Sequence, residues 1–218
     1  MKHFTKLALL SLFFMTGCGT TSHITSSWRA VDVQPKEYKK IVVLGLIRDA
    51  DKTLREKMEQ HIVDDLKELG YNAVCSCEEY NPKAFENMSE KDAIAKLRNS
   101  GVDAVLTVTL LDKAKEKYYV KGRFEYAPYN EYPNFYNYYR TTFERVYTPG
   151  YFVENTKYFW ESNFYEMTSG QLLYSSQSQS FDPASSQRLS HEYGQMIVKD
   201  MKKNYVISDQ KAPVLKPM

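Results

Sequence analysis

Hydrophobic and polar positions along the first half of this chain follow patterns that predict strands separated by helices. Residues Ile41 to Ile47 form a short apolar run rich in β-branched side chains, typical of a strand buried on both faces. Apolar residues then recur at spacings of three or four, as in an amphipathic helix: Leu54, Met58, Ile62, Leu66 and Leu69. Asp49 or Asp51 can cap this helix and Gly70 can end it. Tyr71 to Cys77 predicts a second strand.

The same alternation continues through the next forty residues. Ser89 and Asp92 form a capping-box pattern ahead of a helix that Gly101 closes. Val102 to Leu111 is another run rich in strand-forming residues. The resulting order, β-α-β-α-β, favours a parallel or mixed sheet with helices packed against it.

The second half predicts a β-hairpin followed by a terminal helix. The strands are expected at Thr156 to Met167 and Gln171 to Phe181, joined by a turn that contains Gly170. Asp182-Pro183 fits a helix N-cap followed by proline at the first helical position. The helix has this apolar stripe: Leu189, Tyr193, Met196, Ile197 and Met201. Val206 and Ile207 are candidates for a last short strand. The fold class predicted is therefore α/β, with a mixed central sheet of about five strands and three main helices.

The first residues have the pattern of a secretion signal. Lys2 and Lys6 precede an apolar run from Leu7 to Met15, two small residues follow, and then comes Cys18. The run is too short to span a bilayer as a helix of the mature protein. With Cys18 in this position, the segment resembles the lipobox of bacterial lipoproteins, which implies removal of residues 1–17 and acylation of Cys18. The alternative is an ordinary cleaved signal with an incidental cysteine.

The residue after Cys18 bears on the membrane to which such a protein is delivered. It is Gly19 rather than aspartate, and no acidic cluster follows it. This resembles lipoproteins that pass to the outer membrane and face the periplasm. The membrane, reached through the N-terminal lipid, is therefore the first predicted partner.

The rest of the chain divides by composition. Residues 18–38 are mostly polar and predict a tether, in which Trp28 is expected to pack onto the domain that follows. Residues 39–207 are predicted to form a periplasmic α/β domain with a tyrosine-rich insertion near 118–150, and residues 208–218 a tail. The 29 basic and 27 acidic side chains nearly balance. Nucleic acid is therefore not expected as a partner.

The sequence contains no recognisable catalytic, cofactor-binding or metal-binding motif. It lacks a phosphate-binding glycine loop and a nucleophile elbow. The histidines that follow the signal stand in no local catalytic motif: His23, His61 and His191. We therefore predict no catalytic residue, no cofactor and no metal, and a protein that is not an enzyme.

Cys75 and Cys77 are the cysteines that follow the lipobox. On an extended strand both side chains face one side, too far apart for a relaxed disulfide. They could begin a metal site, but no matching Cys or His pair lies near them in the sequence. The prediction is buried or half-buried thiols at the end of a strand.

Two stretches of the chain carry a family resemblance. The first runs from Trp28 to Ser76, with Tyr38-Lys-Lys-Ile-Val-Val-Leu-Gly and Leu-Gly-Tyr-Asn-Ala-Val-Cys-Ser, and the second is Met167-Thr-Ser-Gly-Gln-Leu-Leu-Tyr-Ser-Ser176. Both look like a family of small bacterial lipoproteins of undefined function. That family is similar in architecture to the amino-terminal domain of TolB and to the lipoprotein activators of penicillin-binding proteins. The resemblance implies a non-catalytic envelope lipoprotein and transfers no active-site residue.

The tyrosine-rich segment is the candidate binding surface. Residues 118–165 hold 12 of the 18 tyrosines, and prolines make 124–138 a predicted loop. Tyrosine combines an apolar face with a polar tip, which suits surfaces that bind proteins or sugars. The residues expected to contact a partner are Tyr129, Tyr132, Tyr136, Tyr138 and Tyr139. The alternative is a structural flap.

Two functions remain open at this point. The first is a lipid-anchored, non-catalytic interaction or accessory module whose partner is a periplasmic or envelope protein. The alternative is a glycan-binding or hydrolytic envelope protein that uses the aromatic loop. A glycosidase needs a pair of carboxyl groups at the scissile bond. The candidates are Glu125, Glu131, Glu144, Glu161 and Glu166, and the alternative is that these carboxylates belong to solvated faces of the domain.

Overall fold

A computed structural model describes residues 22–80, 83–120 and 151–211. In these ranges the chain forms one mixed six-stranded sheet with the order β1-β6-β5-β4-β2-β3. The strands are β1 (Ser22–Arg29), β2 (Ile41–Leu46), β3 (Ala73–Cys75), β4 (Ala104–Val120), β5 (Tyr151–Glu166) and β6 (Leu172–Phe181). The helices are α2 (Lys52–Glu68), α3 (Ser76–Glu79), α4 (Glu90–Asn99) and α6 (Ser186–Lys203), with a 3-10 turn at Asp49–Asp51. The predicted α/β class is confirmed.

The sheet has a parallel half and an antiparallel half. Strand β2 lies between β3 and β4 and runs parallel to both, as the β-α-β-α-β order requires. Strands β4, β5, β6 and β1 are antiparallel to one another. The predicted hairpin is strands β5 and β6, and Gly170 takes a positive φ of 75° in its turn.

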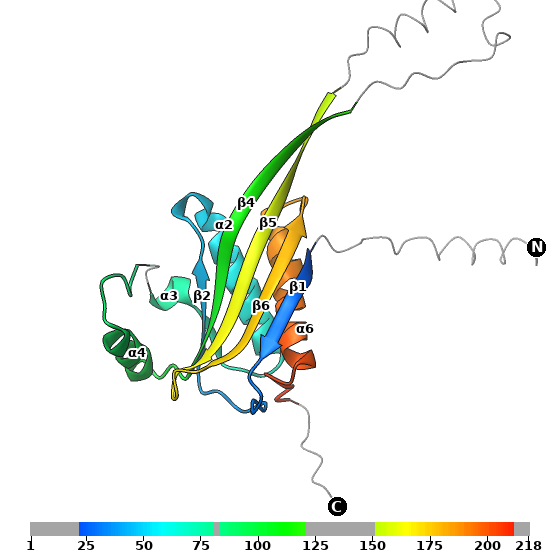
Figure 1. The fold of residues 1–218 in the computed structure, drawn as a ribbon. Helices are drawn as coiled ribbons and strands as arrows, with labels where there is room; N and C mark the ends of the chain where they lie inside the picture. The colour runs from blue at the N-terminus through cyan, green and yellow to red at the C-terminus, as the bar shows by residue number, and fades with distance from the viewer. Residues whose placement is uncertain (1–21, 81–82, 121–150, 212–218) are drawn as a thin grey trace, which may run out of the picture.

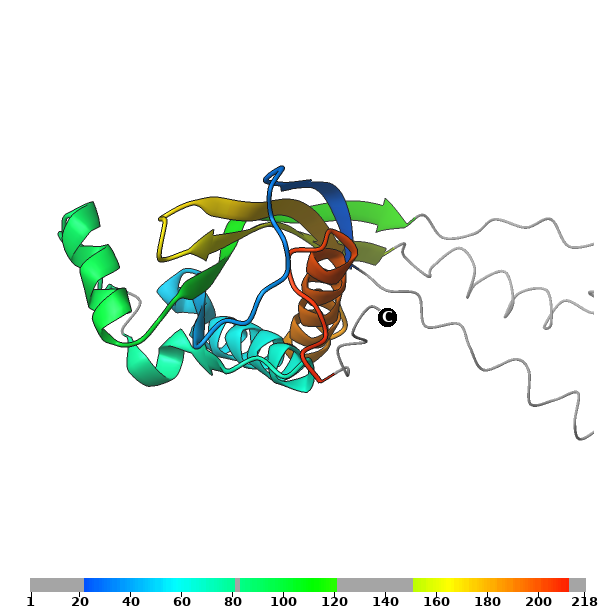
Figure 2. The ribbon, with the colours of Figure 1, turned by 90° about the horizontal axis from the view of Figure 1, so that it is seen from below.

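Two layers of apolar side chains hold the sheet in place. Helices α2 and α6 cover one face together (Figure 2), and the larger core lies between them and the sheet. Met58, Ile62 and Leu66 of α2 have no exposed surface, and neither does Ile197 of α6. A smaller cluster on the other side joins Val42 and Val105 to residues near α3 and α4. Strand β2 is thus buried on both faces, as its continuous apolar run predicts.

The two long helices approach each other closely where α6 has a glycine. A Cβ atom at Gly194 would lie 2.7 Å from Asp65 Oδ2 and 3.4 Å from Ile62 Cγ1. Below the same stretch of α6, the Tyr193 hydroxyl lies 2.8 Å from Ser162 Oγ on β5. The absence of a side chain at Gly194 therefore lets α6 lie close to α2, and the small Ser162 gives the Tyr193 hydroxyl room to reach β5.

The predicted tether contains a strand. Residues 22–29 pair antiparallel with β6 as the edge strand β1, and Ser22 Oγ lies 2.7 Å from Ser180 Oγ. The polar composition hid this strand, because an edge strand is held by backbone hydrogen bonds and needs no apolar face. Trp28 is 52% exposed, so the prediction that it packs onto the domain is wrong.

Several element ends differ from prediction for local reasons. The strand expected over Tyr71 to Cys77 stops at Cys75, where the chain turns into α3. Helix α6 starts after Ser185, whose hydroxyl accepts from the Arg188 N–H, so the predicted cap at Asp182 is wrong. Val206 and Ile207 form no strand but are buried in the core. Strand β4 continues to Val120 rather than ending at Leu111.

Candidate functional site

Most of the site residues that the sequence predicts lie outside the described ranges. Cys18 and the five tyrosines of the predicted surface, Tyr129, Tyr132, Tyr136, Tyr138 and Tyr139, lie outside the described residues. The same holds for Glu125, Glu131 and Glu144. Glu161 and Glu166 are both on β5, five residues or about 16 Å apart along the strand. That separation exceeds the spacing of a glycosidase carboxylate pair.

The structure describes the two strands between which most of the tyrosine-rich segment lies in the sequence, β4 and β5. Strands β4 and β5 extend well beyond the rest of the sheet and project from it as a ribbon (Figure 1). The β2 ladder of β4 ends at Thr109, and the β6 ladder of β5 begins at Lys157. Beyond these points, among the residues that the structure describes, the two strands pair only with each other, from Lys115 opposite Thr156 to Val120 opposite Tyr151. We call this two-stranded part, residues 115–120 and 151–156, the arm.

The arm carries aromatic side chains in solvent. Tyr118 and Tyr119 are each 50% exposed and Phe152 is 72% exposed. The Tyr119 and Phe152 rings lie 5.1 Å apart between their centroids, a cross-strand aromatic pair. An isolated two-stranded ribbon is only marginally stable in water. Exposed aromatic rings on such a ribbon are typical of a contact surface.

Ion pairs occupy the base of the arm. Glu154 contacts Lys115 at 2.6 Å and Lys117 at 3.0 Å, and Glu116 contacts Lys157 at 2.8 Å. Solvent screens exposed pairs of this kind, so they add little to stability. The positive and negative charges of the arm balance. The arm therefore differs from the rest of the surface in its exposed aromatic rings and not in its charge.

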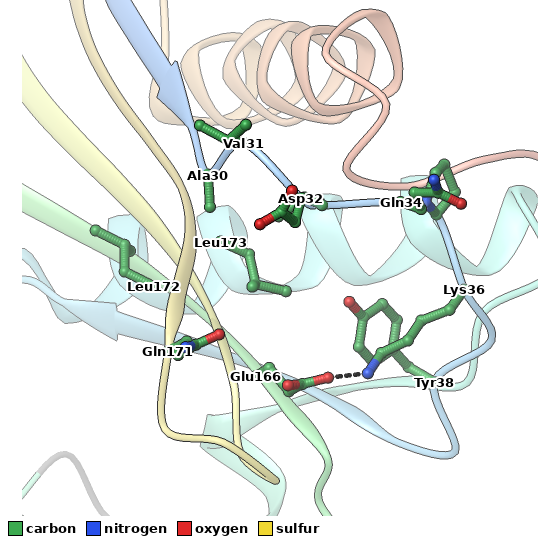
Figure 3. A pocket seen from close by; sticks show the side chains of 12 residues that line it. Ala30, Val31, Asp32, Gln34, Lys36, Tyr38, Glu166, Gln171, Leu172 and Leu173 are labelled. Carbon is green, nitrogen blue, oxygen red and sulfur yellow. Dashed lines mark hydrogen bonds and ion pairs between the residues drawn. The ribbon is translucent and has the colours of Figure 1, made fainter.

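A hollow of about 760 Å³ lies at the opposite end of the sheet, between the loop that follows β1 and the β5–β6 turn. Figure 3 shows Lys36 directed at Glu166, with which it forms an ion pair, beside the Tyr38 ring. Burial raises the pKa of the Tyr38 hydroxyl. Its described lining contains no histidine, cysteine or serine. Among the lining residues that the structure describes, one ion pair, Lys36 with Glu166, joins the loop after β1 to the end of β5.

Helices α2 and α6 bring two histidines together. The rings of His61 and His191 lie 5.4 Å apart, and His61 Nε2 is 2.7 Å from Gln187 Nε2. Burial, with a contribution from His191, lowers the pKa of His61. Asp65, on the same face of α2, has its pKa raised to about 6 by burial and by the neighbouring Glu68. The shifted pKa values of His61 and Asp65 make the interface of α2 and α6 sensitive to pH.

The two cysteines lie closer together than the sequence indicates. Cys75 and Cys77 are joined by a disulfide, with Cα atoms 5.1 Å apart. The prediction that they are too far apart is wrong, because Cys77 is not on the strand. The chain leaves β3 at Cys75 and enters α3, which turns the Cys77 side chain back toward its neighbour. The prediction of a buried thiol position holds for Cys75, which is 1% exposed, whereas Cys77 is exposed.

A buried glutamate completes this group. Glu59 of α2 is 0% exposed, and its Oε2 lies 2.9 Å from Cys75 Sγ and 3.1 Å from the Cys77 N–H that donates to it. The Ser76 hydroxyl reaches both carboxyl oxygens at 3.0 Å, and the Gly45 N–H donates to Oε1 at 2.8 Å. Burial raises the pKa of Glu59, although these hydrogen bonds and Arg55 oppose the shift.

Sequence reasoning missed Glu59, and its spacing explains why. It lies 16 residues before Cys75, in an amphipathic helix. In the sequence it is one polar residue among the others that separate the apolar positions of that helix. A signal exists in Gly45, since a Cβ atom there would lie 2.8 Å from Glu59 Oε1 and 2.7 Å from Arg55 Cγ. A glycine inside an otherwise apolar strand marks a close approach of this kind.

Comparison with known proteins yields structural similarity alone. No known protein family matches the chain, and no curated protein matches it. The PelC dodecamer from Paraburkholderia phytofirmans aligns with 83% of this chain and 93% of its own, at 10% identity and a TM-score of 0.40. The lipoprotein GNA1162 from Neisseria meningitidis aligns with 75% of this chain and 98% of its own, at 15% identity and a TM-score of 0.40.

A third similar structure is a neuraminyllactose-binding hemagglutinin homolog from Helicobacter pylori. It aligns with 82% of this chain and 94% of its own, at 11% identity and a TM-score of 0.35. Similarity of this degree concerns the course of the backbone and carries no information on what this chain binds. Within the described residues, no helix is long and apolar enough to cross a membrane.

Proposed function

We propose that this protein is a lipid-anchored envelope protein that acts as a non-catalytic interaction module. The observation that carries the proposal is the arm, which presents Tyr118, Tyr119 and Phe152 to solvent on a ribbon that no other described strand joins. Such rings contribute more to a partner's interface than to the fold of the chain that presents them.

The partner proposed is a protein of the same envelope compartment. The arm offers aromatic rings and balanced charge, which suit a protein surface better than an anionic polymer. The tyrosine-rich residues between its two strands, including Tyr129, Tyr132, Tyr136, Tyr138 and Tyr139, belong to the proposed surface. The relation to the TolB amino-terminal domain and to the activators of penicillin-binding proteins is part of the same proposal.

The anchor proposed is an acylated Cys18 in the outer membrane, with the folded domain in the periplasm. Its support is the signal pattern that ends at Cys18 and the glycine that follows. Several acyl chains hold a protein on a bilayer far more firmly than one, since each buried methylene contributes about 0.8 kcal/mol. Cys18→Ser is expected to release the protein from membranes or leave it unprocessed, which fractionation and mass spectrometry of the N-terminus measure.

The interaction is tested by cross-linking in intact cells that express the full chain. We expect one envelope protein to cross-link to the wild type and to be lost when Tyr119→Ala and Phe152→Ala are combined. Trp28→Ala is the matched control, because it truncates another exposed aromatic side chain, on β1, away from the arm.

Two results would contradict the interaction proposal. Equal capture by the wild type and the arm variant would show that the arm is not the contact surface. Retention of the wild type on purified cell-wall glycan, lost in the arm variant and accompanied by no protein cross-link, would favour the glycan-binding alternative.

A further inference from the structure

The group formed by Cys75, Cys77 and Glu59 has an asymmetry that a structural cross-link does not need. Cys77 is exposed and borders a surface hollow of about 340 Å³, whereas Cys75 and Glu59 lie beneath it, 1% and 0% exposed. The disulfide closes a loop between residues only two apart in sequence, so it hardly restricts the unfolded chain. One accessible sulfur, one sheltered sulfur and a buried acid are the parts of an exchange reaction.

We propose that Cys75 and Cys77 form a thiol–disulfide exchange centre, in which the exposed sulfur of Cys77 reacts with a protein dithiol and Glu59 transfers the proton of Cys75. This activity is independent of the arm. It lies at the carboxyl ends of parallel strands β2 and β3, where ligands of open α/β sheets commonly bind.

The reaction that oxidises the partner begins when a thiolate of the partner attacks Cys77 Sγ. A bond forms between the partner's sulfur and Cys77, and the Cys75–Cys77 bond breaks with its electron pair on Cys75. Glu59 gives its proton to Cys75 and recovers one from solvent. The partner's second thiolate then attacks the partner's first sulfur, which is bonded to Cys77 in the mixed disulfide. Cys77 leaves as a thiolate. The partner's two thiols become a disulfide, and Cys75 and Cys77 are reduced by two electrons.

The surroundings of Glu59 suit this role. Its Oε2 is 2.9 Å from Cys75 Sγ, within reach of a direct proton transfer. Burial favours the protonated carboxyl, which is the form needed when Cys75 leaves. The Ser76 hydroxyl and the Gly45 N–H hold the carboxyl in this position through both states.

A metal site is the competing use of the same atoms. The ligand atoms of Glu59, Cys75 and Cys77 all lie within 4.8 Å of one another. However, the two sulfurs are bonded to each other, and the Glu59 oxygens already accept hydrogen bonds from Gly45, Ser76 and Cys77. Thiolates must be free to bind a metal, so the observed arrangement favours exchange.

The test uses the full chain extracted from membranes in detergent and equilibrated in glutathione buffers of graded ratio. After acid quenching and alkylation, trypsin releases residues 68–83, which contain both cysteines and no internal Lys or Arg. We expect this peptide to pass from the disulfide form to the doubly alkylated form within the range of the buffers. Cys75→Ser is expected to collect glutathione on Cys77 at least about tenfold faster than Cys77→Ser collects it on Cys75, because Cys75 is buried.

Glu59→Gln tests the proton transfer. We expect dithiothreitol to reduce the disulfide of this variant about tenfold or more slowly than that of the wild type at neutral pH. The dependence of this rate on pH is also expected to lose the contribution of the Glu59 carboxyl group. Asp65→Asn is the control, because Asp65 is another acid of α2, partly buried and away from the cysteines. If Glu59→Gln does not fold, the pH profile of the wild type decides, since a rate that simply follows the dithiothreitol thiolate contradicts a role for Glu59.

Three results would overturn the centre itself. The first is a peptide whose cysteines keep one redox state across all the glutathione buffers. The second is equal reactivity of Cys75 and Cys77 in the single variants. The third is one equivalent of Zn²⁺ retained by the full chain that protects both thiols from alkylation, which would make this a metal site.

Discussion

Strands β4 and β5 pass through two different environments, and the contrast separates what holds the fold from what it presents. In the body of the sheet, Leu106, Val108 and Phe164 are completely buried beneath α2 and α6. In the arm, the same two strands keep their ladder, yet Tyr119 and Phe152 stand in solvent. In the body each strand also pairs on its other side, β4 with β2 and β5 with β6, whereas in the arm the two strands have only each other among the described residues. The helix layer likewise covers the body and, within the described part of the chain, does not cover the arm.

This contrast shows that aromatic residues of one strand pair have two roles. Burial of an aromatic ring contributes about 1.5–3 kcal/mol, and the body receives this contribution. The exposed rings of the arm receive little of it from the described residues. Substitutions in the two regions are therefore expected to separate stability from the proposed binding.

The largest effect is expected in the body, at Trp160. This side chain is 1% exposed and packs against Tyr193 at 5.1 Å and Tyr158 at 6.0 Å between ring centroids. Trp160→Ala leaves a cavity between β5 and α6 and is expected to lower the free energy of unfolding by about 3–5 kcal/mol. Urea unfolding followed by circular dichroism measures it.

Phe159→Ala is the control for Trp160→Ala. Phe159 is the adjacent residue of β5 and is only partly buried. Its loss is expected to cost much less, and an equal loss at both positions would show that the body is not organised around the helix-covered face.

A smaller effect is expected at the interface of α2 and α6, from Asp65→Asn. The pKa of Asp65 is raised to about 6, so between about pH 4 and pH 6 the folded state binds a proton that the unfolded state has lost. Stability from this group therefore falls as pH rises through that window. Asp65→Asn removes the loss and is expected to raise stability above pH 6 by about 1 kcal/mol, after allowance for solvent screening.

Thermal unfolding of wild type and variant from pH 4 to pH 8 measures the effect. The groups around Asp65 are Asp64, Glu68 and His191, and they are unchanged in the variant. The lowered pKa of His61 gives a slope of opposite sign below about pH 6.5, which the difference between the two proteins removes. A variant whose advantage is constant over this range would contradict the assignment.

The smallest effect on stability is expected in the arm. Tyr119→Ala with Phe152→Ala removes only exposed rings, so the free energy of unfolding is expected to change by less than about 0.5 kcal/mol. The same variant is expected to lose its envelope partner. A large drop in melting temperature would show that these rings stabilise the fold, and that the arm does not differ from the body of the sheet in this respect.

The body was largely predictable from the sequence because its elements have strong periodicity. The apolar run at Ile41, the helix stripe that includes Met58 and the turn at Gly170 all lie where their patterns place them. Strand β1 was not predictable, since its residues are polar and its pairing with β6 is a tertiary event. The exposure of the arm also depends on where neighbouring strands stop, which no local pattern in β4 or β5 records.

The cysteine group shows the same limit at the level of a site. The spacing of Cys75 and Cys77 predicts separated thiols only when both lie on one strand. The change from β3 to α3 between them reverses that conclusion. Glu59 comes from a different element and is brought in by the packing of α2 onto the sheet. Long-range packing of this kind leaves no local spacing to find.

The edge strand β1 has a consequence for how far the domain can move. Because Ser22 is already in the sheet, only residues 19–21 separate it from the proposed acylated Cys18, a span of about 14 Å at full extension. The β1 end at Ser22 is also the end from which the arm rises, since Ser22 pairs with Ser180 and Ser180 pairs with Tyr158. An acylated Cys18 would therefore hold the base of the arm beside the bilayer. Partners in the same membrane would meet it at a high effective concentration, and weak contacts at the arm would suffice.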